Sequence, residues 1–68
     1  MKWEAIVGAN IRRLRKAKGL TQEQLAQEAD TALRYVAGVE RGEENPSLKF
    51  LVKIAEALDV EPTALLAP

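Results

Sequence analysis

The segment from Leu20 to Gly42 most constrains the fold of this chain, because it holds two short amphipathic patterns separated by a tight turn. The first pattern starts at Thr21, with Gln24 at the reciprocal position of a capping box, and predicts a helix. A second helix is predicted over residues 32–40, and Gly42 is expected to end it in the left-handed conformation. Two short helices packed this closely leave little freedom to the rest of the chain.

The remaining sequence predicts three further helices and no strand. Residues 1–18 form an amphipathic pattern in which Gly8 indicates a close contact with another helix. Ser47 is expected to cap a helix, and Pro62 opens a last short one at the favoured first-turn position. The apolar face of the helix after Ser47 is expected to contain Leu48, Leu51, Val52, Ile54, Ala55 and Leu58. The prediction is therefore an all-α, compact five-helix bundle, a single domain over 1–68 with its core motif at about 21–41.

Composition excludes several classes of function. The 68 residues include no Cys and no His, which removes disulfides and the commonest metal ligands, so we expect no metal site and no cofactor. No apolar run has the length of a membrane span, and a cytoplasmic protein without membrane contact is expected. An enzyme is the weakest reading, because Ser and Thr have no His to activate them. Ten basic and ten acidic residues give zero net charge, so the charge balance alone does not indicate a nucleic-acid partner.

Longer stretches of the chain resemble a known family. GLTQEQLAQEA, followed by YVAGVERGEENPSLKFLVKIAEALDV, resembles the phage-repressor and Cro type of helix-turn-helix, also called the XRE type, over about residues 6–66. Within that family, the Y-x-x-G-x-E-R-G segment resembles the controller proteins of restriction–modification systems. The resemblance implies a lambda-repressor-like fold with a recognition helix at about 32–40. It also implies a transcriptional regulator that binds double-stranded DNA, as a homodimer on a pseudo-palindromic operator.

Base reading would fall to the exposed positions of the recognition helix. Arg34 is able to make a bidentate contact to guanine, while small or apolar side chains could pack on thymine methyl groups. Relatives often carry polar side chains at several of these positions, so the chain departs from the usual pattern. Asp30 stands where a turn glycine is common, and whether Thr31 or Asp30 caps the helix is left open. The residues expected to read bases are Ala32, Leu33, Arg34, Ala37 and Gly38.

The resemblance also assigns contacts to the DNA backbone and one internal ion pair. Gln22 would bind a phosphate at the start of its helix, where backbone N–H groups and the amide can act together. Arg15 and Glu40 match a buried salt bridge that orients the recognition helix. The residues expected to contact the backbone are Arg12, Gln22, Tyr35, Arg41, Asn45 and Ser47.

Two questions about partners stay open at the level of sequence. A dimer surface is expected at Val60, Leu65 and Leu66, although these residues could equally cover the core. Trp3 is expected to act as a lid on the core rather than as a partner-binding residue. The alternative function is a protein-interaction module on the same fold, motivated by the apolar Leu33 and the zero net charge. No pocket for a small-molecule ligand is apparent.

Overall fold

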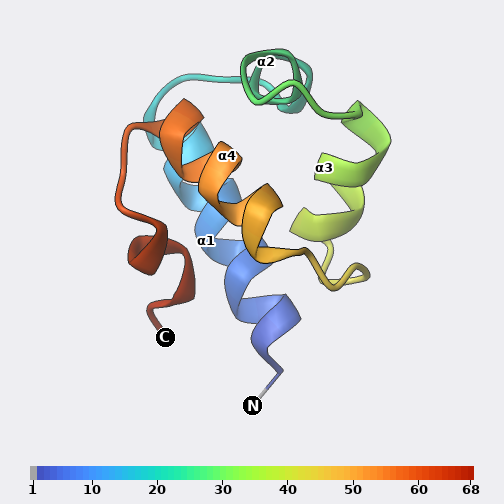
Figure 1. Cartoon of the computed structure of the whole chain (residues 1–68), viewed down its shortest axis with the longest axis vertical. Helices are drawn as coiled ribbons and strands as arrows, with labels where there is room; N and C mark the ends of the chain where they lie inside the picture. Colours follow the sequence, from blue (N-terminus) through green and yellow to red (C-terminus); the bar gives the residue numbers. More distant parts are fainter. Residues whose placement is uncertain (1) are drawn as a thin grey trace.

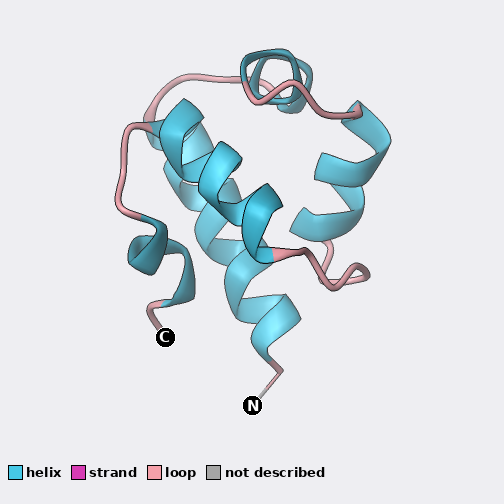
Figure 2. Ribbon diagram, in the orientation of Figure 1, coloured by secondary structure: helices cyan, strands magenta, loops and turns pink. Residues whose placement is uncertain are grey.

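The computed structural model describes residues 2–68 and consists of four α-helices and one short 3-10 helix (Figures 1 and 2). The predicted first helix included Met1, which lies outside the described residues. No strand occurs in residues 2–68, and no helix there is long and apolar enough to cross a membrane. The elements are α1 (Trp3–Ala17), α2 (Gln22–Glu28), α3 (Leu33–Glu40), α4 (Leu48–Leu58) and the 3-10 helix η1 (Pro62–Leu66).

Side-chain caps fix where α2 and α4 begin. At α2, the Thr21 hydroxyl accepts from the Gln24 N–H at 3.0 Å, and the Gln24 side chain accepts from the Thr21 N–H at 2.8 Å. At α4, the Ser47 hydroxyl accepts from the Phe50 N–H at 3.1 Å. Each cap satisfies backbone donors that have no partner within the helix. The capping box and the Ser47 cap predicted from the sequence are therefore confirmed.

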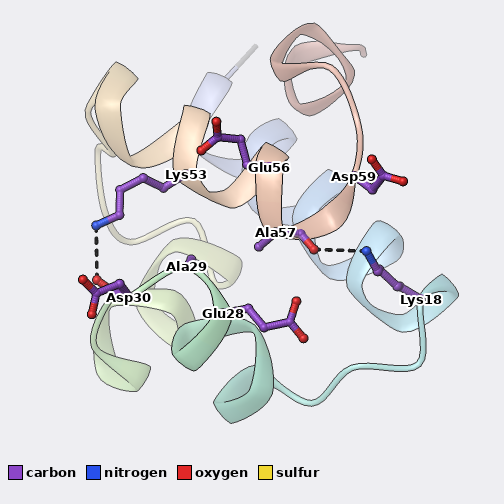
Figure 3. Close-up of a pocket in the computed structure, with 8 residues that line it drawn as sticks. All are labelled: Lys18, Glu28, Ala29, Asp30, Lys53, Glu56, Ala57 and Asp59. Carbon is purple, nitrogen blue, oxygen red and sulfur yellow. Dashed lines mark hydrogen bonds between the residues drawn. The ribbon is translucent and has the colours of Figure 1, made fainter.

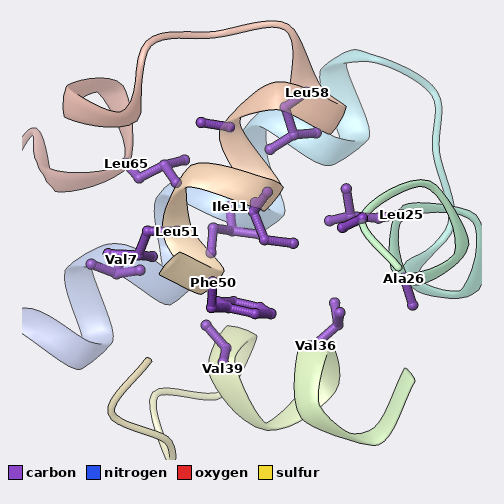
Figure 4. Packing of buried hydrophobic residues seen from close by; sticks show 13 residues of the cluster. Val7, Ile11, Leu25, Ala26, Val36, Val39, Phe50, Leu51, Leu58 and Leu65 are labelled. Carbon is purple, nitrogen blue, oxygen red and sulfur yellow. The ribbon is translucent and has the colours of Figure 1, made fainter. Parts of the chain in front are cut away.

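The core is aliphatic, and every helix contributes to it (Figure 4). The helix α1 runs through the middle of the molecule, with α3 on one side of it and η1 on the other (Figure 1). Leu25 of α2, Ile54 of α4 and Leu65 of η1 are fully buried, with 0% of their surface exposed. A small domain depends on such complete burial, because it has little other apolar surface to remove from water.

The fifth predicted helix is a 3-10 helix instead of an α-helix. It has only five residues, and its Ala64 N–H donates to the Glu61 carbonyl at 2.9 Å, the i to i+3 spacing of a 3-10 turn. The side chain of Asn10 in α1 donates to the carbonyls of Leu65 and Ala67, at 3.0 and 2.8 Å. These bonds hold the C-terminal residues against α1 in a segment too short for several α-helical bonds.

The structure corrects three further details of the prediction. Leu48 and Val52 were expected on the buried face of α4, but they are 73% and 37% exposed. Trp3 is 51% exposed, so it covers the core only in part. The recognition helix begins at Leu33, one residue later than predicted, because Ala32 has an extended backbone and is its N-cap.

The helices α1 and α3 approach each other most closely at Gly8. A Cβ atom at this position would lie 2.3 Å from the Val39 carbonyl oxygen and 2.8 Å from that of Glu40. Real side chains do not tolerate such distances to backbone atoms, so only glycine allows this approach. The close helix contact predicted from Gly8 is therefore confirmed, and it places α3 directly against α1.

We predict that Gly8→Ala destabilises the protein by about 2 kcal/mol or more, because overpacking against rigid backbone costs about 1–3 kcal/mol. Gly38→Ala in α3 is the matched control, since its methyl group would meet the flexible Glu44 side chain at 2.9 Å. That control should keep or slightly raise stability, because alanine favours helices more than glycine. Urea denaturation followed by circular dichroism measures both. Equal stability of the two variants would contradict the packing argument.

Candidate nucleic-acid interface

The turn between α2 and α3 is tight and has a defined C-terminal cap. Asp30 adopts a φ of 54°, in the left-handed region that Asp tolerates better than most non-glycine residues. The Thr31 N–H then donates to the Ala26 carbonyl at 2.9 Å, and the Asp30 N–H to that of Gln27 at 3.2 Å. This pair of bonds is a Schellman motif, which ends α2 and redirects the chain at once. Asp30 thus takes the left-handed position at the end of α2, where members of the resembled family commonly have a glycine.

One side of α3 is open to solvent at its N-terminal end. Ala32, Leu33 and Arg34 are exposed, and Leu33 shows 44% of its surface to solvent. Ala37 follows one turn later and is half-buried. No side chain caps the start of α3, so neither of the two candidate caps, Asp30 and Thr31, takes that role.

Gly38 was expected to be exposed, but the structure buries it. The Glu44 side chain from the loop after α3 lies over it, with Cγ 2.9 Å from where a Cβ of residue 38 would stand. Gly38 therefore has no surface of its own to offer a base. The expectation followed the recognition-helix positions that the family resemblance implies, and these give no indication that the side chain of a loop residue lies against α3.

A buried ion pair fixes α3 to α1. The Arg15 Nε donates to Glu40 Oε2 at 2.7 Å, and Arg15 Nη2 donates to Oε1 at 3.0 Å, so the guanidinium and carboxylate meet in a bidentate pair. Their side chains are 9% and 1% exposed. The remaining Arg15 nitrogen, Nη1, donates to the Leu20 carbonyl at 2.8 Å. Each polar group of this pair is thus satisfied despite its burial.

The same carboxylate also binds α2. Gln22, the first residue of α2, donates from Nε2 to Glu40 Oε1 at 2.9 Å. Glu40 therefore accepts hydrogen bonds from α1 and α2 at once, and the three helices share one polar centre. The orientation of α3 relative to the start of α2 depends on this centre.

The other residues expected at the DNA backbone lie around this region in different environments. Arg12 is exposed on α1, and Asn45 is exposed in the loop after α3. Arg41 forms a solvent-exposed salt bridge with Glu43 at 3.1 Å, a kind of pair that contributes little to stability. Ser47, also exposed, already serves as the cap of α4.

Tyr35 has a packing role that the sequence did not indicate. Its ring meets the Phe50 ring edge-on, with centroids 4.8 Å apart and an angle of 89° between the planes. This contact joins α3 to the start of α4. Tyr35 is half-buried, and part of its ring is taken up by this contact with Phe50.

The residues expected to form a dimer surface do not all reach the surface. Leu65 is 0% exposed and belongs to the core. The Asn10 side chain of α1 donates to the Leu65 carbonyl and holds this part of η1 against α1. Val60 is half-buried, and Leu66 is 41% exposed. Asn10 itself was missed as an important residue, although a polar residue on an otherwise apolar face was the available signal.

A shallow cavity of about 670 Å³ lies between the C-terminal end of α2 and the C-terminal half of α4 (Figure 3). Two of the residues that line the cavity are lysines that bind backbone carbonyls. Lys53 Nζ donates to the Asp30 carbonyl at 3.1 Å, and Lys18 Nζ donates to the Ala57 carbonyl at 3.2 Å. Cations placed at carbonyls near helix ends are stabilised by the helix dipole. These contacts join neighbouring elements, and we assign the cavity no ligand.

Most of the chain matches a known protein family. A model of the helix-turn-helix family matches residues 11–65. This chain belongs to the helix-turn-helix family. Membership confirms the resemblance to the XRE type of helix-turn-helix that the sequence motifs carried. In this fold α2 and α3 are the two helices of the motif, and α3 lies at the position predicted for the recognition helix.

Named relatives of this helix-turn-helix protein are similar over most of its length. An uncharacterized HTH-type transcriptional regulator of Sinorhizobium fredii, y4dJ, is 38% identical over 68 residues, which cover 100% of this chain and 88% of that protein. The crystal structure of the restriction–modification controller C.AhdI from Aeromonas hydrophila has a TM-score of 0.89 and 48% identity, and the match covers 91% of this chain and 94% of that one.

A second solved structure contains DNA. The crystal structure of SinR, a master regulator for biofilm formation, in complex with DNA has a TM-score of 0.86 and 39% identity, with 90% of this chain and 98% of that chain covered. This helix-turn-helix chain spans 56% of the full-length SinR of Bacillus subtilis. All three are similar to this chain in sequence, and the two solved structures are similar to it in fold as well.

We predict that Glu40→Leu destabilises this helix-turn-helix protein strongly, by about 3–5 kcal/mol, because it leaves the Arg15 charge buried without its partner. The double variant Arg15→Met/Glu40→Leu should recover much of that loss, since no buried charge remains. Glu40→Gln, which keeps one acceptor, should fall between Glu40→Leu and the wild type. Free energies of unfolding from urea titration test this order. A double variant as unstable as Glu40→Leu alone would contradict it.

Proposed function

We propose that the chain is a transcriptional regulator that binds double-stranded DNA in a sequence-specific way. The observation that carries this proposal is its likeness to SinR as crystallised with DNA, at a TM-score of 0.86 and 39% identity. The relatives named as transcriptional regulators and restriction–modification controllers support the same function. The exposed start of α3 supplies a surface that fits this role.

In the proposed complex, α3 lies in the major groove with its N-terminal end towards the bases. Arg34 is exposed there and carries the planar guanidinium that matches guanine O6 and N7. Leu33, 44% exposed, and Ala32 would pack on thymine methyl groups. Ala37 is half-buried and would allow the helix to approach the base edges closely.

The backbone contacts are proposed from residues around α3. One N–H of the Gln22 amide donates to Glu40, and the second N–H is directed to a phosphate in our proposal. Arg41 would exchange its weak surface partner Glu43 for a phosphate. The Ser47 hydroxyl accepts from the α4 backbone and still has a proton to donate. Arg12, Tyr35 and Asn45 are proposed as further contacts at the edge of the interface.

We further propose that the chain acts as a homodimer. One recognition helix reads few base pairs, whereas two related by a two-fold axis read a pseudo-palindrome with half-sites about one helical turn apart. An apolar patch is available on the face formed by the start of α1, α4 and η1. Trp3 and Leu66 line one hollow with Leu51. Leu48 and Val52 are exposed one turn apart on α4, the helix that carries Leu51, and would extend the patch. This patch replaces the surface that was expected to include Leu65.

The DNA function is tested by selecting bound duplexes from a randomised pool and sequencing them, with Arg34→Ala at the same salt concentration. We expect a palindromic sequence whose guanine preference is lost in the variant, with affinity reduced by about 1–3 kcal/mol. Lys16→Ala removes one exposed charge outside the proposed contacts and is the control. Binding should also weaken steeply as salt rises. If the folded wild type enriches no DNA sequence, the proposed regulator function is wrong and a protein-interaction module is favoured.

The dimer is tested by analytical ultracentrifugation of Val52→Asp and Leu66→Asp. We expect wild-type protein to sediment as a dimer at micromolar concentration and both variants as monomers, because a charge buried in an apolar interface has no partner. Leu33→Asp is the matched control, since Leu33 has a similar exposed fraction, 44% against 41% for Leu66, but lies on α3. A wild type that stays monomeric, or variants that remain dimeric, would contradict this surface.

A further inference from the structure

The Glu44 side chain occupies the place on α3 where a side chain of residue 38 would stand. A Cβ atom on Gly38 would lie 2.9 Å from Glu44 Cγ, 3.3 Å from its carboxylate Oε2 and 3.6 Å from Cδ. The side chain therefore lies against the helix at Gly38, while the residue as a whole stays exposed to solvent. Gly38 leaves room for the Glu44 side chain, because glycine has no Cβ atom.

Gly38 follows Arg34 by four residues, so the two positions lie one turn apart on the same face of α3. That face is the one whose N-terminal end is open to solvent. Ala32, Leu33 and Ala37 have no side-chain hydrogen-bonding group to offer there. The loop residue Glu44 thus adds a carboxylate to a surface where the helix itself supplies Arg34.

A carboxylate is unfavourable beside DNA phosphates unless it accepts a hydrogen bond from a base. An ionised Glu is an acceptor only, so its partner in the major groove must be a donor. Cytosine presents its N4 amino group, whereas adenine places the N7 acceptor beside its amino group. Cytosine is therefore the base whose edge matches a lone carboxylate.

We propose that Glu44 is a specificity-determining residue that accepts a hydrogen bond from cytosine N4 in the half-site bound by α3. The proposal rests on the DNA-binding function proposed above and names a base reader outside the recognition helix. Gly38 is a positioning residue in this arrangement, because its missing side chain lets the carboxylate lie against α3.

The chain contains a matched control for charge. Glu43 is the neighbouring residue in the same loop, with the same charge, but it forms a surface salt bridge with Arg41 at 3.1 Å. The loss of one negative charge near the phosphates should by itself strengthen binding to all sequences alike, whichever of the two residues is neutralised. A change in base preference, by contrast, requires contact with a base.

The test compares the wild type, Glu44→Gln, Gly38→Ala and Glu43→Gln by selection from a randomised duplex pool at one salt concentration. We expect Glu44→Gln to lose the cytosine preference at one symmetry-related position and to prefer adenine there, since a Gln amide pairs with adenine N6 and N7. The change in discrimination should be about tenfold. Gly38→Ala displaces the carboxylate without changing charge, and should lose the same cytosine preference. Glu43→Gln should keep the wild-type profile.

Thermal unfolding of each variant accompanies the selection, and Gly38→Ala is expected to fold because its new methyl group meets only a flexible side chain. Unchanged base preferences in Glu44→Gln and Gly38→Ala would overturn the proposal. A uniform gain in affinity for Glu44→Gln, equal to that for Glu43→Gln, would also overturn it and leave only charge repulsion. If the wild type itself selects no sequence, the proposed DNA function fails instead, which separates the two failures.

Discussion

The carboxylate of Glu40 is the interaction on which the rest of the structure depends. It is almost fully buried and accepts from Arg15 and Gln22, so one side chain holds α1, α2 and α3 together. A buried ion pair adds little net stability compared with apolar residues of similar size. The pair instead orients the helices, because bidentate and amide hydrogen bonds are directional whereas aliphatic packing is not. The end of the recognition helix is thereby oriented by hydrogen bonds and not by packing alone.

Much of the fold could be predicted from local chemistry. The caps at Thr21 and Ser47 act on backbone groups three positions later, which the sequence itself specifies. Gly8 indicated a close helix contact, although its partners Val39 and Glu40 lie on another helix. The interface was harder, because a side chain from a loop decides what α3 presents. The family resemblance placed Gly38 among the exposed positions of the recognition helix, and nothing in the sequence indicated that the Glu44 side chain lies over it. The burial of Leu65 likewise depends on a tertiary hydrogen bond, from Asn10 some 55 positions earlier.

The close approach of α1 and α3 at Gly8 has a consequence for the geometry of the proposed dimer. The helix α1 lies between α3 and η1, so its packing sets how far the recognition helix stands from the apolar patch (Figure 1). In a two-fold dimer, that distance contributes twice to the separation of the two recognition helices. The absence of a Cβ at Gly8 lets α1 and α3 meet at backbone distance. In the proposed dimer, this residue would therefore help to set the spacing between the two copies of α3. A wider contact between α1 and α3 would change the distance between the two recognition helices of the proposed dimer. That distance would then no longer match the spacing of the half-sites, even with every base-contacting residue intact.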